Sequence, residues 1–306
     1  MKTLRLRFLA SALLSLMGCR SVESTNDPEL PRGRVMTVGG YRLFLRQTGT
    51  GPDVVLLHGL GDSSLGWQFI EPDLVRAGYR VTVWDGLGAG RSEKPAHADY
   101  SVLAHVKRME EALDALRIRE AVIVGHSLGG SEALLFAERN PGRVRALCLI
   151  DPAAYRAGAM RGRWFWTTPL LAETVLGLLP AKNITRYGLE QNFYDQEAIS
   201  NELERRYLRE VRRDGAIRFL IAQERQIVPR DPQKWEDAHR TIRKRTLILW
   251  GSEDKLVPVT QGERLVKDID GARLVVFPGV GHSPQLEAPQ SVLYHMLPFL
   301  EKVGLE

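Results

Sequence analysis

A serine interrupts an apolar run in the stretch AVIVGHSLGGSEALLFA, which covers residues 121–137. The residues before the serine have the composition of a short buried strand, and those after the glycines have the Ala and Leu content of a helix. Gly125 and Gly129 remove the Cβ atoms that would clash in a sharp turn with a positive φ at its apex. The pattern is typical of a nucleophile elbow, which exposes the hydroxyl of Ser127. An ordinary glycine-rich turn between a strand and a helix is the alternative.

Apolar runs that alternate with helical stretches predict the fold class. The clearest helix is residues 101–116, in which apolar residues recur at spacings of three and four and therefore share one face. Two runs about Gly39 and Gly40 predict a hairpin after order begins near Arg34. The remaining strand-like runs are residues 54–57, 79–84, 121–124, 144–150, 246–250 and 272–277. We therefore expect an α/β fold, with a mostly parallel sheet flanked by helices on both faces.

The alternation fails for about ninety residues in the second half of the chain, and these residues look like an insertion. They are helical in character, aromatic and rich in arginine. We place the insertion at residues 154–241 and the core at residues 34–153 and 242–303. Residues 201–226 carry their charges mainly on one side of a helix, which indicates a solvated face. Residues 161–179 are more apolar and either dock the insertion on the core or face a cavity.

The first eighteen residues have the pattern of a signal peptide. Three basic residues precede the apolar run 8–17, which is too short to span a bilayer as a helix. The run ends in LMGC, which resembles the lipobox of bacterial lipoproteins, where the cysteine receives lipid and becomes the new N-terminus. Cys19 is that cysteine here, and plain secretion after ordinary cleavage is the alternative. Residues 19–33 are polar and contain two prolines, so we interpret them as a tether.

Cleavage after residue 18 would determine the location and the partners of the mature chain. Arg20 stands where an aspartate would signal retention in the inner membrane. We therefore expect a lipoprotein of the Gram-negative outer membrane that faces the periplasm, or otherwise a periplasmic or secreted protein. The cleaved chain would keep 39 basic and 37 acidic residues. Because no basic stripe is interleaved with aromatics, we expect no nucleic-acid partner. We expect a monomer, with Cys148 as a buried free thiol.

A serine hydroxyl is a weak nucleophile, so the elbow predicts a base, a carboxylate and donors for an oxyanion elsewhere in the chain. In α/β enzymes of this type the order is serine, acid, histidine, and the partners follow later strands. His282 follows the strand that ends near Phe277, whereas the other histidines precede this region or fall in helical stretches. Asp254, with Glu253 beside it, follows the strand that ends at Trp250. Asp151 follows an earlier strand and is the alternative acid.

The oxyanion donors are expected to be backbone N–H groups. One is the N–H of Leu128, directly after the serine, and the other is the N–H of Leu60 in the loop HGLG. His58, at the start of this loop, is expected to be structural and to hydrogen-bond the loop backbone. His126 lies within the elbow, where it is expected to pack against the site or line it.

Five motifs together resemble the α/β-hydrolase superfamily: HGLG at 58–61, DGLGAGRS at 85–92, GHSLGG at 125–130, GSEDKLVP at 251–258 and GHSPQLEAP at 281–289. The chain is most similar to the capped branch with monoacylglycerol lipases, carboxylesterases, meta-cleavage C–C hydrolases and cofactor-free haloperoxidases. The resemblance implies an eight-stranded sheet, a helical cap after the sixth strand and no cofactor. It favours Asp254 over Asp151 as the acid. Leu87 departs from the proline often found in the second motif.

These observations predict a serine hydrolase of a small-molecule carboxylic ester with a moderately long apolar acyl chain. Ser127 is the expected nucleophile, His282 the base and Asp254 the acid, with Leu60 and Leu128 at the oxyanion. The serine argues against dehalogenases and epoxide hydrolases, which carry aspartate at this position.

Two alternatives stay open: a C–C hydrolase of an anionic dienoate, for which Arg161 or Arg163 would line the cavity, and a non-catalytic envelope lipoprotein with the hydrolase fold. A dinucleotide loop at Gly86 is disfavoured, because Arg91 replaces the third glycine of GxGxxG. The absence of an HExxH motif and of clustered histidines predicts no metal.

Overall fold

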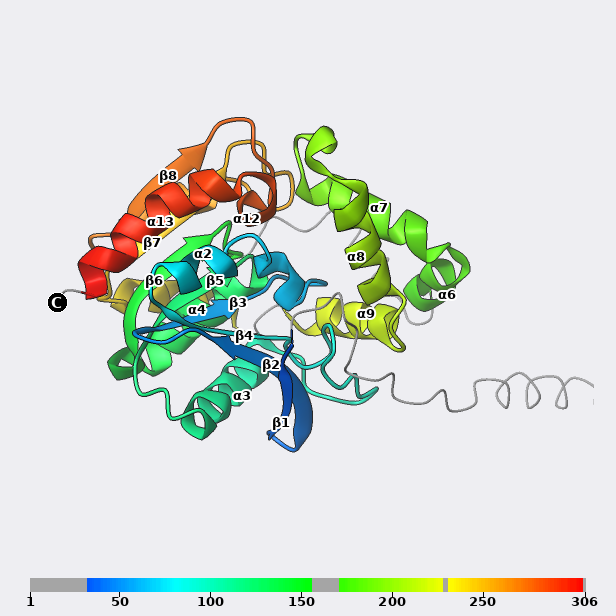
Figure 1. Cartoon of the computed structure of the whole chain (residues 1–306), viewed down its shortest axis with the longest axis horizontal. Coiled ribbons are helices and arrows are strands. Elements are labelled where there is room, and N and C mark those ends of the chain that lie inside the picture. The colour runs from blue at the N-terminus through cyan, green and yellow to red at the C-terminus, as the bar shows by residue number, and fades with distance from the viewer. Residues whose placement is uncertain (1–31, 156–170, 228–230, 305–306) are drawn as a thin grey trace, which may run out of the picture. The chain divides into compact units, whose positions relative to one another are not determined.

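The computed structural model describes residues 32–155, 171–227 and 231–304 (Figure 1). The expected signal peptide, Cys19 and nearly all of the tether lie outside these residues. So do Arg161, Arg163 and the aromatic group at residues 164–166. In the described part of the chain, no helix has both the length and the apolar character required to cross a membrane.

Eight strands form one sheet in the order β1-β2-β4-β3-β5-β6-β7-β8, which confirms the expected fold class. Strands β3 to β8 run parallel, whereas β2 pairs antiparallel with both β1 and β4. The predicted hairpin at Gly39 and Gly40 joins β1 to β2, and both glycines have positive φ. The strands are β1 (Arg34–Val38), β2 (Tyr41–Thr48), β3 (Asp53–Leu57), β4 (Arg80–Trp84), β5 (Ala121–His126), β6 (Val144–Ile150), β7 (Thr246–Gly251) and β8 (Arg273–Phe277).

Helices cover both faces of the sheet, as the apolar periodicity predicts. One buried cluster joins the strands to α3 (Val102–Ala115), α4 (Leu128–Arg139) and α11 (Thr260–Asp268). A second cluster, on the opposite face, joins them to α2 (Glu71–Arg76) and α13 (Pro289–Gly304). In a parallel sheet both faces are buried, which is why the central strands are nearly continuous apolar runs. Cys148 in β6 is a fully buried free thiol in this core.

The described residues between β6 and β7, where the sequence predicts an insertion, are mainly helical. The described elements there are α6 (Leu171–Leu178), α7 (Ala181–Asn192), η3 (Gln196–Ala198), α8 (Asn201–Val211), α9 (Ala216–Gln226), α10 (Pro232–Ala238) and η4 (His239–Thr241). Figure 1 shows α6 to α9 grouped together. The single helix expected over residues 201–226 is wrong, because α8 ends at Val211 and a turn separates it from α9, whose N-cap is Gly215 with a φ of 82°. We call the elements α6 to η4 the cap.

Candidate active site

The turn that carries Ser127 has the strand, apex and helix that its sequence predicts. β5 ends at His126, Ser127 has φ 50° and ψ −114°, and α4 begins at the next residue. A Cβ on Gly125 would lie 2.3 Å from the carbonyl oxygen of Gly129, and one on Gly129 would lie 2.3 Å from that of Leu57. Only glycine fits at either position, because backbone atoms occupy the space that a side chain would need. The turn therefore presents the hydroxyl of Ser127 at the carboxyl end of the sheet.

His282 and Asp254 reach this hydroxyl from the loops after β8 and β7. The Nε2 atom of His282 is 2.9 Å from Oγ of Ser127, and its Nδ1 is 2.6 Å from Oδ2 of Asp254. The side chains of His282 and Asp254 are 4% and 0% exposed. The loops after β5, β7 and β8 thus bring three residues, far apart in the chain, into one line of hydrogen bonds.

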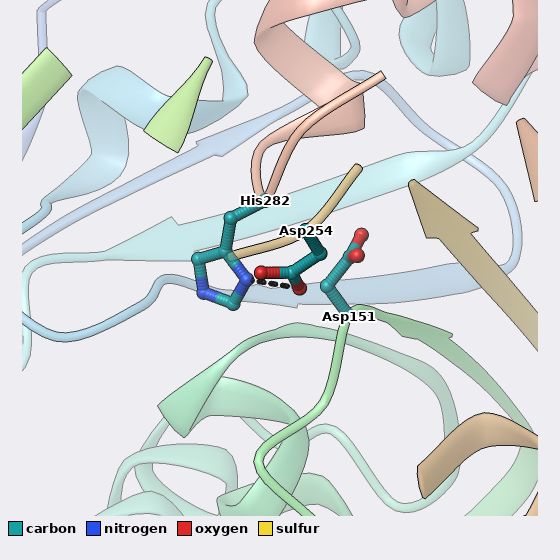
Figure 2. Close-up of side chains that lie close together, drawn as sticks. All are labelled: Asp151, Asp254 and His282. Atoms are coloured by element: carbon teal, nitrogen blue, oxygen red, sulfur yellow. Dashed lines mark hydrogen bonds and ion pairs between the residues drawn. The ribbon is translucent and has the colours of Figure 1, made fainter. Parts of the chain in front are cut away.

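The two other carboxylates weighed as the acid lie elsewhere. Glu253 accepts a hydrogen bond from Oγ of Ser252 at 3.0 Å and is exposed. Asp151 lies beside Asp254, as Figure 2 shows, and its Oδ1 accepts a hydrogen bond from the N–H of Gly251 at 3.0 Å. Nδ1 of His282 is therefore hydrogen-bonded to Asp254, in agreement with the favoured assignment.

The environment keeps Asp254 ionised. Burial raises its pKa, but the charge of His282 and the hydrogen bonds that the carboxylate accepts together hold the pKa below its ordinary value. The backbone N–H groups of Leu256 and Val257 donate to Oδ1 of Asp254 at 2.8 and 2.9 Å. A carboxylate held in this way can orient an imidazole and stabilise its protonated form.

The HGLG loop after β3 packs against the serine turn. Nδ1 of His58 lies 2.8 Å from the carbonyl oxygen of Gly59, and its Nε2 accepts the N–H of Gly86 at 2.9 Å. His58 therefore holds the loop backbone, as expected. Among the described residues, the N–H groups of Leu60 and Leu128 have no protein acceptor, which leaves both amides available to a ligand.

His126 has a contact that the sequence does not reveal. Its Nε2 donates to the carbonyl oxygen of His282 at 2.8 Å, so the residue before the serine holds the backbone of the histidine loop. Burial and the neighbouring His282 lower the pKa of His126 to about 3. A neutral imidazole that donates through Nε2 serves this role at neutral pH.

The cap contacts both loops of the site. The hydroxyl of Tyr207 in α8 donates to Oδ1 of Asp62 at 2.9 Å, and Asp62 lies two residues after Leu60. Oγ of Ser283 donates to Oδ1 of Asn192, at the end of α7, at 3.1 Å. Burial raises the pKa of Asp62 to about 6, although His58, Ser63 and Tyr207 oppose the shift. No sequence pattern indicates a role for Tyr207, because the cap contains no recognisable motif.

One group of side chains in the described chain could hold a cation. The carboxylates of Asp151 and Asp254 and a ring nitrogen of His282 all lie within 4.8 Å of one another. Nδ1 of His282 and Oδ2 of Asp254 are already hydrogen-bonded to each other, and Nε2 of His282 faces Ser127, so a cation here would break the line that ends at Ser127 and we do not assign the three residues as metal ligands.

Comparisons with known proteins show that this chain is similar to hydrolases. A family model for the alpha/beta hydrolase fold matches residues 52–289. The 2-hydroxymuconate semialdehyde hydrolase of Pseudomonas sp. (strain CF600) is 32% identical, and the match covers 86% of this chain and 90% of that protein.

Solved structures agree with this result. A meta-cleavage product hydrolase from Pseudomonas fluorescens IP01 is 28% identical with a TM-score of 0.75, and the match covers 88% of this chain and 98% of that one. A candidate lipase from Acinetobacter baumannii AYE is also 28% identical with a TM-score of 0.75, and the match covers 89% and 91% of the two chains.

Proposed function

The chain belongs to the α/β-hydrolase fold family and is a hydrolase, and we propose that it cleaves a carboxylic ester through a covalent acyl-enzyme on Ser127. The observation that carries this proposal is the line of hydrogen bonds from Ser127 through His282 to Asp254, at 2.9 and 2.6 Å. Such a line activates a hydroxyl for attack on a carbonyl carbon.

The proposed reaction uses each of these groups in turn. Oγ of Ser127 attacks the ester carbonyl while Nε2 of His282 takes its proton, and Asp254 stabilises the imidazolium that forms. The N–H groups of Leu60 and Leu128 bind the oxyanion of the tetrahedral intermediate. His282 then protonates the leaving alkoxide, the alcohol departs, and a water molecule hydrolyses the acyl-enzyme by the same steps in reverse.

An apolar acyl chain is proposed because apolar cap residues lie close to the oxyanion loop. A Cβ on Gly61 would lie 3.2 Å from Cδ1 of Leu220 in α9, so this leucine covers the loop. Three apolar side chains of α6 and the residue after it are not buried against the core: Val175, Leu178 and Leu179 are 38%, 80% and 45% exposed. Each methylene buried in an apolar slot contributes up to about 0.8 kcal/mol to binding.

Hydrolysis of a C–C bond is the second candidate. Two relatives, the 2-hydroxymuconate semialdehyde hydrolase and the meta-cleavage product hydrolase, favour it, with 32% and 28% identity. An anionic dienoate would need a cationic partner in the cavity. On α8, Arg205 and Arg206 both pair with Glu202, and Arg213, in the turn after α8, pairs with Glu210, which offsets part of the cap's positive charge. We rank the uncharged ester first for this reason.

A substrate series separates the two candidates. The purified protein would be assayed with p-nitrophenyl esters from acetyl to palmitoyl and, in parallel, with a 2-hydroxy-6-oxo-dienoate. We expect a medium-chain ester to exceed the acetate in kcat/KM by one to two orders of magnitude, roughly the value of two or three buried methylenes. Equal kcat/KM across the esters, or turnover of the dienoate alone, would reject the ester proposal.

A fluorophosphonate probe tests the nucleophile independently of the substrate. We expect the wild-type protein to be labelled and Ser127→Ala to be unlabelled. Equal labelling of both proteins would show that another residue is the nucleophile.

We also propose that lipid on Cys19 anchors the protein to the outer membrane. The LMGC motif supports this proposal, and two or more acyl chains on one cysteine would give stable attachment. Wild-type protein should fractionate with outer membranes and Cys19→Ala with the soluble fraction. Membrane-bound Cys19→Ala protein that resists extraction without detergent would contradict the proposal.

A further inference from the structure

A second carboxyl group lies next to Asp254 and has no part in the proposed reaction. Asp151 directly follows β6, and Asp254 lies in the loop after β7, the adjacent strand of the sheet. Figure 2 shows the two carboxyl groups side by side, with His282 on the far side of Asp254. Asp151 is 0% exposed, and its backbone has a φ of 42°, which is uncommon for a residue other than glycine.

The hydrogen bonds around the two carboxyl groups are unequal. Asp254 accepts three: two from the backbone N–H groups of Leu256 and Val257 and one from His282. Asp151 accepts one, from the N–H of Gly251 to Oδ1. Its Oδ2 is buried, and no donor among the described residues reaches it. An ionised Asp151 would therefore leave a charged oxygen unsatisfied in the protein interior, which is costly.

A proton on Asp151 removes this cost. A neutral carboxyl group can donate to the neighbouring carboxylate, so both side chains become satisfied. Burial, followed by the charge of Asp254, raises the pKa of Asp151 well above its ordinary value, and the charge of Glu287 acts in the same direction. From the residues that the structure describes, Asp254 already accepts three hydrogen bonds and Asp151 only one, so the proton belongs on Asp151. In agreement, the interaction of the two side chains raises the pKa of Asp151 and lowers that of Asp254.

We propose that Asp151 is a neutral carboxylic acid at pH 7 that donates a hydrogen bond to Asp254 and thereby positions the carboxylate that orients His282. Asp151 is a positioning residue, because it acts through Asp254 and contacts no reacting atom. Its Oδ1 accepts from Gly251 at the end of β7, so one side chain links the ends of β6 and β7 behind the site. The proposal rests on the proposed function only in taking Ser127, His282 and Asp254 as the catalytic groups.

Two substitutions separate a neutral donor from an ionised acid. Asp151→Asn keeps a donor for Asp254 and an acceptor for Gly251, and asparagine tolerates a positive φ. We expect its kcat to stay within about threefold of the wild type. Asp151→Gly also adopts the positive φ but removes the donor, and we expect kcat to fall about tenfold with KM little changed, as for the loss of a hydrogen bond to a charged group. A loss for Asp151→Asn as large as that for Asp254→Asn would overturn the proposal.

A double-mutant cycle tests whether Asp151 acts through Asp254. In an Asp254→Asn background, the further change Asp151→Gly should alter kcat less than twofold, because the carboxylate that it positions is already gone. A merely structural role would give losses that multiply, and that result would overturn the proposal. If the protein turns over no ester, the rate at which a fluorophosphonate probe labels Ser127 replaces kcat in the same comparison of variants.

The protonation state is measured directly by NMR of protein labelled with 13C at the aspartate carboxyl carbons. We expect one resonance of a protonated carboxyl at pH 7 that is absent from Asp151→Asn. This measurement needs no substrate, so it is independent of the ester proposal. A spectrum in which every aspartate is ionised at pH 7 would overturn the inference.

Discussion

Tyr207 donates its hydroxyl to Oδ1 of Asp62 at 2.9 Å, which joins helix α8 of the cap to the loop that carries Leu60. The same carboxylate oxygen accepts the N–H of Ser63 at 2.8 Å. Asp62 therefore holds the backbone next to an expected oxyanion donor and is itself held by the cap. This hydrogen bond joins residues that are 145 positions apart in the chain, and we expect it to help position the N–H of Leu60.

Replacing Tyr207 with phenylalanine should slow the chemical step. The lost hydrogen bond frees the Asp62 loop, so the N–H of Leu60 is less well placed for an oxyanion that exists only in the transition state. We expect kcat to fall about threefold to tenfold with KM nearly unchanged. Tyr187→Phe, at a site of the cap that is 65% exposed, is the matched control and should retain full activity. An unchanged kcat in Tyr207→Phe would show that this contact does not position the loop.

Asp62 should also make stability depend on pH. Its pKa is raised from 3.8 to about 6, chiefly by burial. Between these values the unfolded chain has released the proton and the folded chain retains it, so folding stability falls as pH rises through this window.

Asparagine at position 62 does not titrate, so Asp62→Asn lacks this pH-dependent part of the folding stability. We expect its free energy of unfolding, relative to the wild type, to rise by about 2 kcal/mol between pH 4 and pH 7, less than the full pKa shift would give because the side chain is only half-buried. Urea denaturation at four pH values measures the difference. A difference that is constant across this range would contradict the assignment.

Local sequence was sufficient to predict the three residues in the line of hydrogen bonds, because each depends on a strand and the loop after it. Ser127, His282 and Asp254 all follow buried strands, and parallel strands bring their carboxyl ends to one edge of the sheet. The contact of Tyr207 with Asp62 could not be predicted in this way. It joins a cap helix without a motif to a loop of the core, and no periodicity relates the two.

The direction in which the carboxyl group of Asp151 points could not be predicted from the sequence either. Its place after β6 made it a candidate for the acid, but whether its carboxyl faces His282 or Asp254 is decided by a backbone turn with a φ of 42°. The error over residues 201–226 has a similar cause. Helical periodicity continues on both sides of the turn at residues 212–215, so the pattern did not reveal that α8 ends at Val211 and that Gly215, with a φ of 82°, begins α9.

Gly125→Ala should damage both stability and activity. Its new Cβ would lie 2.3 Å from the backbone oxygen of Gly129, which cannot move without shifting the start of α4. We expect a loss of about 1–3 kcal/mol in the free energy of unfolding and a clear fall in the labelling rate of Ser127. Gly142→Ala is the control, because a Cβ there meets no atom within 4 Å. Equal stability of the two variants would contradict the close packing of the turn.

Asp254→Asn should cause the largest loss among the carboxyl substitutions near the site. An amide at this position can present its NH2 group to His282, which favours the imidazole tautomer that cannot take the proton from Ser127, and the imidazolium loses its charged partner. The same change in the serine protease example lowers kcat by roughly 10⁴, and we expect a loss of that order here. Glu253→Gln is the matched control, since its neighbouring carboxylate is exposed and hydrogen-bonded to Ser252, and it should leave kcat within about twofold. Steady-state kinetics on the best ester of the series, with active sites counted by fluorophosphonate labelling, measures both variants. A small loss in Asp254→Asn together with a large one in Glu253→Gln or Asp151→Asn would move the acid to another loop and reject the line of hydrogen bonds as the catalytic arrangement.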